Sequence, residues 1–166
     1  MLVLPARRVT RPARYDTAML IEARTPEVLD EVRSTDAHGR LLAAVTEAAS
    51  EPHVMAARGV RSLGDVDRSP PGLFLFFDFT CEDPEVAIEP WEHLAGWYVR
   101  ETGLEDSTLL VPIDDVDYVL VNHARRDKRL LRLAAEQLSK KTFRCYVAAN
   151  LRANLTVAMP VLYRLA

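Results

Sequence analysis

The stretch LFLFFDFTC, Leu73 to Cys81, is the most apolar part of the chain, and it decides the fold. Its aromatic and aliphatic side chains fill consecutive positions, and only Asp78 interrupts them. Because successive side chains of a strand point to opposite faces of a sheet, this pattern predicts a strand covered on both faces. A buried carboxylate needs hydrogen-bond partners or a proton, so Asp78 is a candidate catalytic base, with a strand-end hydrogen bonder as the alternative.

Strands and helices alternate around this stretch. A capping residue followed by Pro and Glu occurs at Thr25-Pro26-Glu27 and at Asp83-Pro84-Glu85, and it predicts a helix start at each. The expected strands are 17–23, 54–63, 73–81 and 107–113. Over residues 17–113 the order is therefore strand, helix, strand, strand, helix, strand, which is the ferredoxin-like split βαβ unit with an antiparallel sheet.

The pattern then begins again. Residues 118–123 and 157–165 have the composition of strands, and residues 127–138 and 143–154 have helical spacing. We therefore expect an α+β protein with an extended arm at 1–14, a first ferredoxin-like unit at 15–115 and a second, partial unit at 116–166 packed with the first. The second sheet face is then covered by the second unit or by another subunit, which gives an α+β barrel.

Composition excludes several classes of protein. The 166 residues are 49% hydrophobic and 27% charged, which suits a compact core. No apolar run approaches the roughly 20 residues of a membrane-spanning helix, so we expect a cytoplasmic protein without membrane contact. Residues 118–166 carry 10 Lys and Arg against 2 Asp and Glu. This basic segment suits an acidic carrier protein or the acidic remainder of the chain, and no nucleic-acid-binding motif accompanies it.

The sequence contains no nucleotide-binding, zinc-protease or hydrolase motif. Cys81 and Cys145 lie far apart, and no two of the four His have ligand spacing on one helix, so we expect neither a metal nor a cofactor. Any chemistry must come from dispersed residues. His123 ends a predicted strand and suits a general base, while its neighbour Asn122 faces the opposite side and can donate to an oxyanion.

The helix after Asp83 supplies the expected substrate contacts. Trp91 and Tyr98 share one face, which also packs on the sheet, whereas Trp97 lies on another face that suggests a subunit contact or a cavity wall. Glu22, at the end of the predicted first strand, is a further candidate for substrate binding. Core packing is the alternative for Trp91, and a strand-end hydrogen bond is the alternative for Glu22, Asn122 and His123.

The stretch PWEHLAGWY, Pro90 to Tyr98, together with the element order, resembles the dimeric α+β barrel superfamily, nearest the antibiotic-biosynthesis monooxygenases and polyketide-tailoring proteins. The resemblance implies a homodimer and an aromatic, polyketide-like substrate, and it carries over to Trp91. It favours a natural-product tailoring enzyme, a cofactor-free monooxygenase or cyclase that abstracts a proton in a barrel cavity. The alternative is a non-catalytic ligand-binding or oligomerisation module of the same fold, and a haem-using form with His123 as ligand is a third hypothesis.

Overall fold

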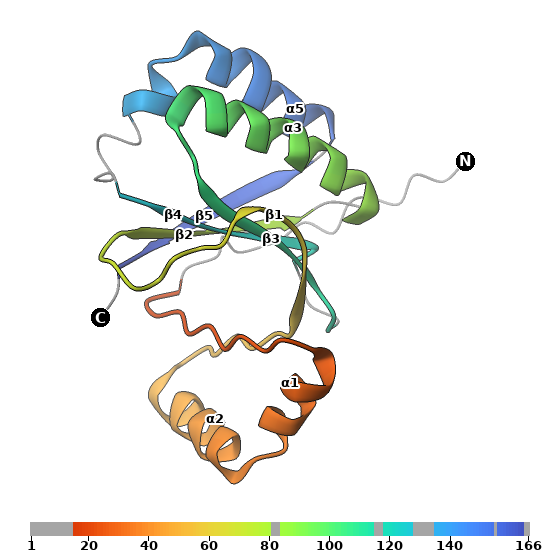
Figure 1. Cartoon of the computed structure of the whole chain (residues 1–166), viewed down its shortest axis with the longest axis vertical. Helices are drawn as coiled ribbons and strands as arrows, with labels where there is room; N and C mark the ends of the chain where they lie inside the picture. The colour runs from red at the N-terminus through yellow and green to blue at the C-terminus, as the bar shows by residue number, and fades with distance from the viewer. Residues whose placement is uncertain (1–14, 81–83, 115–117, 128–134, 155, 165–166) are drawn as a thin grey trace. The chain divides into compact units, whose positions relative to one another are not determined.

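The computed structural model describes residues 15–80, 84–114, 118–127, 135–154 and 156–164, except for the side chains of residues 77, 78 and 84–87 (Figure 1). Two compact units are present. One is Thr17–Met55, and the other contains Ala56–Ala166 together with the residues up to Asp16. The α+β class expected from the sequence is confirmed.

The Thr17–Met55 unit contains two helices, α1 (Pro26–Arg33) and α2 (Asp36–Ala48). Each begins at a threonine cap, where the hydroxyl of Thr25 or Thr35 accepts a hydrogen bond from a backbone N–H of the first turn. Neither helix contains a buried residue. The cap at Thr25 was predicted, whereas the break between the helices falls before Thr35 and not at Gly39.

The prediction of a strand at residues 17–23 is wrong. The segment has no strand conformation, and Met19, near its centre, is 63% exposed. A short apolar run becomes a strand only when another strand pairs with its backbone. No described strand pairs with this segment, so its composition alone was misleading.

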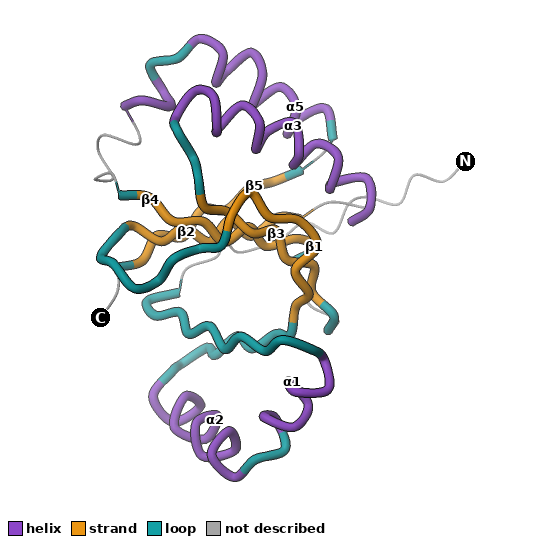
Figure 2. The backbone as a smooth tube through the Cα atoms, viewed as in Figure 1, coloured by secondary structure: helices purple, strands orange, loops and turns teal. Residues whose placement is uncertain are grey.

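The larger unit is built on one antiparallel sheet (Figure 2). Its described strands are β1 (Ala57–Gly64), β2 (Leu73–Thr80), β3 (Asp106–Pro112), β4 (Leu120–Arg126) and β5 (Val157–Tyr163). They lie in the order β1-β3-β4-β2-β5, and each neighbouring pair is antiparallel. Residues 120–126 and 157–163 therefore belong to the same sheet as residues 73–80, and the described residues of 116–166 form no second sheet.

Two helical connections cross the same face of this sheet (Figure 1). Helix α3 (Pro84–Thr102), with Pro90 inside it, joins β2 to β3. The π-helix η1 (Phe143–Val147) continues into α5 (Ala148–Ala153), which leads to β5, and residues 135–138 are also helical. The expected order of strand, helix, strand, strand, helix, strand is thus found at Leu73–Tyr163 and not at 17–113.

The core lies between the sheet and α3. It consists of Phe79, Trp91, Ala95, Leu109 and Leu120, with Leu151 of α5 packed against it. Adjacent residues of β2 are buried on opposite faces of the sheet, as Phe74 and Leu75 show. The prediction that this strand is covered on both faces is confirmed.

Leu109 offers a test of this core because its side chain is fully buried. We expect Leu109→Ala to lower the free energy of unfolding by about 2–4 kcal/mol, since the substitution removes buried surface and leaves a cavity. Leu138→Ala is the matched control, because Leu138 is 60% exposed, and we expect it to change stability by less than about 0.5 kcal/mol. Urea unfolding followed by circular dichroism measures both, and equal effects would contradict the assignment of the core.

Candidate functional site

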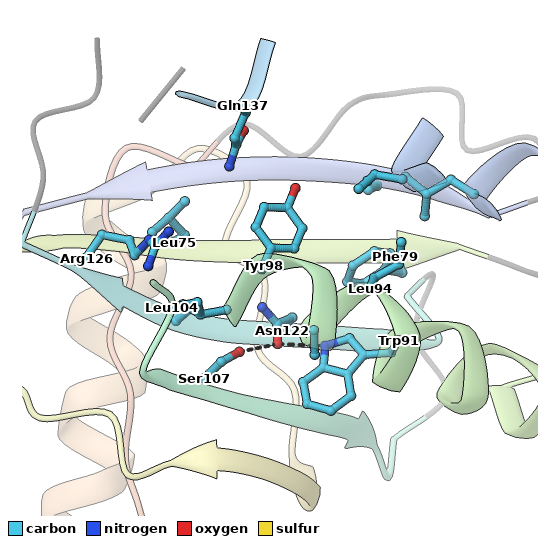
Figure 3. A pocket seen from close by; sticks show the side chains of 15 residues that line it. Leu75, Phe79, Trp91, Leu94, Tyr98, Leu104, Ser107, Asn122, Arg126 and Gln137 are labelled. Atoms are coloured by element: carbon cyan, nitrogen blue, oxygen red, sulfur yellow. Dashed lines mark hydrogen bonds between the residues drawn. The ribbon is translucent and has the colours of Figure 1, made fainter. Parts of the chain in front are cut away.

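A cavity of about 80 Å³ lies between the sheet and its helices (Figure 3). Apolar side chains from β2, α3, β4 and α5 form most of its wall. The polar and charged side chains among its fifteen lining residues are Tyr98, Ser107, Asn122, Arg126 and Gln137. A mostly apolar cavity with a few converging polar groups is the usual form of a small-molecule site.

Asn122 is the best-defined polar group of this cavity. It lies at the centre of the sheet, where β4 pairs with both β2 and β3, and its side chain is buried. Its Oδ1 accepts hydrogen bonds from Trp91 Nε1 at 2.9 Å and from Ser107 Oγ at 2.8 Å. Because an indole N–H only donates, the bond to Trp91 fixes which amide atom is the oxygen.

The other end of this amide is available to a ligand. Asn122 Nδ2 has no hydrogen-bond partner among the described residues, and Figure 3 shows it on the side of Asn122 turned away from Trp91 and Ser107. The hydrogen bonds that Trp91 and Ser107 donate to Asn122 Oδ1 therefore fix the orientation of the two Nδ2 N–H groups. The arrangement presents a rigid donor pair to an oxygen atom inside the cavity.

Tyr98 adds a second neutral polar group. Burial raises the pKa of Tyr98 to about 12, and the nearby positive charge of Arg126 opposes the shift only in part. The phenol is therefore protonated at neutral pH and able to donate. Its hydroxyl has no hydrogen-bond partner among the described residues.

Arg126, at the end of β4, supplies the one charged side chain of the lining. Its guanidinium donates to the backbone carbonyl of Thr102 at 3.0 Å and also to the Thr102 hydroxyl, so it caps the C-terminus of α3. Burial lowers the pKa of Arg126, although a guanidinium stays charged at neutral pH. The side chain is only 6% exposed.

The structure brings together three of the residues singled out from sequence. Trp91, Tyr98 and Asn122 all line the cavity. Asn122 is not a strand-end hydrogen bonder, because it lies mid-strand and bonds to side chains from a helix and from another strand. Trp91 serves both the core and the site, since its ring packs and its N–H holds Asn122.

The remaining candidates lie elsewhere. His123 faces the opposite side of the sheet from Asn122, where its ring stacks on Phe76 with the centroids 4.5 Å apart. Asp78 pairs through its backbone with Val121 and Met159, and its side chain lies outside the described residues. Glu22 belongs to the Thr17–Met55 unit. The expected catalytic group of His123, Asp78 and Asn122 is therefore not assembled at this cavity.

The position of Trp97 differs from the one expected from the sequence. It was interpreted as a subunit contact or a cavity wall, but it is buried within the chain against Leu94, Phe143 and Val147. The apolar face that it occupies is covered by η1. The sequence could not reveal this packing, because it depends on how η1 and α3 are placed side by side.

Sequence reasoning missed Ser107, and it counted Arg126 in the basic segment without placing it on the strand of Asn122. The predicted strand stopped at His123, whereas β4 continues to Arg126 and places that residue on the same face as Asn122, four positions earlier. Had the predicted strand been extended by three residues, its alternation would have placed Arg126 on the face of Asn122. Ser107 had no such signal, because its role depends on the register between β3 and β4.

The chemistry of the cavity is that of hydrogen-bond donation. None of its fifteen lining residues is a carboxylate or a histidine, so the lining offers no ordinary proton acceptor. Within the described part of the chain, no group of three or more His, Cys, Asp or Glu is placed to hold a metal ion. None of the described helices combines the length and the apolar character needed to cross a membrane.

Comparison with protein-family models, with curated proteins and with solved structures finds no match to this chain.

The raised pKa of Tyr98 predicts a pH dependence of stability. Between about pH 10, where an unfolded tyrosine ionises, and about pH 12, the unfolded state loses a proton that the folded state keeps. Stability therefore falls as the pH rises through this window, by about 1–3 kcal/mol for this residue. We expect wild-type protein to lose about 1–3 kcal/mol of unfolding free energy relative to Tyr98→Phe over the same range, as measured by urea unfolding. A difference that is constant from pH 8 to 12 would contradict the burial of this phenol.

Proposed function

We propose that this chain binds a small, largely apolar molecule through an acceptor oxygen in the cavity between the sheet and α3. The observation that carries the proposal is the orientation of Asn122. Two donors hold its Oδ1, and the Nδ2 hydrogens are left for a ligand in an apolar enclosure. A ligand oxygen that accepts from Asn122 Nδ2 gains a hydrogen bond that none of the described residues supplies.

The volume limits the ligand. A buried water needs roughly 10–15 Å³ of cavity, so about 80 Å³ holds on the order of five to eight waters. A molecule with a similar number of non-hydrogen atoms fits, such as a substituted benzene or a short acyl chain. Pockets for drug-sized ligands measure roughly 300–1,000 Å³, so a polyketide of several rings would enter only if α3 or α5 moved.

Two features support placing residues 73–163 in a ferredoxin-like unit, which we propose as the fold of this segment. The strands β2 and β3 run in the same direction with β4 between them, and β4 and β5 do so with β2 between them. Each of these two pairs is joined through helix, as in a split βαβ unit. β1 is then an additional strand at one edge, and pairing of two such sheets in a homodimer remains part of the proposal.

A tailoring reaction without a cofactor is the second proposal. Asn122 supports it, because an amide that donates to a ligand carbonyl also stabilises the oxyanion formed when a neighbouring proton is removed. The reaction also needs a base, and His123 lies on the other face of the sheet. Ligand binding requires only the residues already in the cavity and is therefore the preferred function.

Asn122→Asp tests the preferred function. The substitution keeps an oxygen acceptor for Trp91 and Ser107 but replaces the amide donors by an acceptor. We expect wild-type protein to bind the neutral ketone acetophenone, as measured by isothermal titration calorimetry, and Asn122→Asp to bind it about tenfold or more weakly.

Asn154→Asp is the control, because Asn154 donates only to the backbone carbonyl of Asn150 and does not line the cavity. Equal affinity in wild type and Asn122→Asp would contradict the proposal, as would a wild type that binds neither acetophenone nor the related acid benzoate. Exchange of the acetophenone methyl hydrogens with deuterated solvent in the same samples, catalysed by the protein, would favour the tailoring reaction over binding alone.

A further inference from the structure

Arg125 and Arg126 are neighbours in β4, and they differ in whether a carboxylate pairs with the guanidinium. Arg125 has two carboxylate partners: its NH1 lies 3.7 Å from Asp106 Oδ2, and its NH2 bonds to Asp127. Arg126, on the other face, makes no ion pair with any described residue. Its only hydrogen-bond acceptors in that part of the chain are the carbonyl and hydroxyl oxygens of Thr102.

A buried guanidinium without a carboxylate is unusual. Burying a charge is costly unless it is paired, and the C-terminus of α3 supplies only a partial negative charge. Glu136 and Glu105 act on Arg126 from beyond ion-pair distance. Residues 128–134 follow directly in sequence and contain Lys128, Arg129 and Arg132 but no acidic residue. Among the described residues, no carboxylate therefore lies within ion-pair distance of Arg126.

Arg126 lines the same cavity as Asn122, so a ligand can supply the missing charge. Both side chains project from β4 toward the helices, because they are four positions apart on one strand face (Figure 3). The two side chains lack different partners. The Asn122 amide lacks an acceptor oxygen, and the Arg126 guanidinium lacks a negatively charged one. A planar carboxylate presents two acceptor oxygens that share one negative charge.

We propose that the ligand of this cavity is a small monocarboxylate with an apolar body, whose carboxylate is bound by Arg126 and Asn122. The apolar body then packs on the aliphatic and aromatic lining, near Leu75, Leu104 and Phe79. This inference rests on the proposed ligand-binding function and adds the charge of the ligand to it. Benzoate is a planar acid of this kind, and its nine non-hydrogen atoms place it just above the roughly five to eight waters that the cavity volume holds.

The test compares benzoate with acetophenone, which has the same shape and the same number of non-hydrogen atoms but no charge. We expect wild-type protein to bind benzoate about tenfold or more tightly than acetophenone in isothermal titration calorimetry, because a charge-assisted hydrogen bond is stronger than a neutral one. In Arg126→Gln this preference is expected to fall to about one. Arg125→Gln is the matched control on the opposite face, and it should keep the wild-type preference.

A second measurement does not depend on whether the variant folds. In wild-type protein labelled with ¹⁵N, benzoate should shift the side-chain Nε–H resonance of Arg126 and leave that of Arg125 in place. Equal binding of the two probes, or an Arg126 resonance that does not move, overturns the carboxylate assignment but leaves the ligand-binding function standing. Binding of neither probe overturns both.

Discussion

The bifurcated acceptor at Asn122 Oδ1 is the interaction on which the rest of the site depends. It joins α3 through Trp91 and β3 through Ser107 to the central strand β4. All three groups are buried, so each hydrogen bond offsets the free-energy cost of removing a polar group from water. The same bonds fix the amide orientation and so determine that donors, and not acceptors, face the cavity.

This arrangement makes the cavity selective by chemistry more than by shape. The Asn122 amide, the neutral phenol of Tyr98 and the guanidinium of Arg126 all donate, while the lining contains no carboxylate and no histidine. An apolar molecule without oxygen would leave the Asn122 amide and the Tyr98 hydroxyl without an acceptor, and a cation would meet the positive charge of Arg126. A compact molecule with an acceptor oxygen and, by our proposal, a negative charge offers an acceptor to the Asn122 amide and a counter-charge to Arg126.

The sequence predicted the larger unit well because its signals were local. The apolar stretch at Leu73, the helix after it and the later strands all appear close to where they were expected. The cap expected at Asp83 and most of the helix expected at 127–138 lie outside the described residues. The strand at 17–23 failed because pairing is not local. The candidate site divides in the same way: Trp91 and Tyr98 follow from helical spacing and Asn122 from strand alternation, whereas Ser107 depends on register. His123 and Asn122 cannot both line this cavity, because neighbouring residues of a strand lie on opposite faces of the sheet.

The most direct test of the central claim observes the Asn122 side-chain amide itself. In ¹⁵N-labelled protein, titration with acetophenone should shift the Nδ2 proton resonances of Asn122 as they donate to the ketone, while those of Asn154, which already bond to a backbone carbonyl, stay in place. An Asn122 amide whose resonances do not move at saturating acetophenone would contradict ligand binding through this donor.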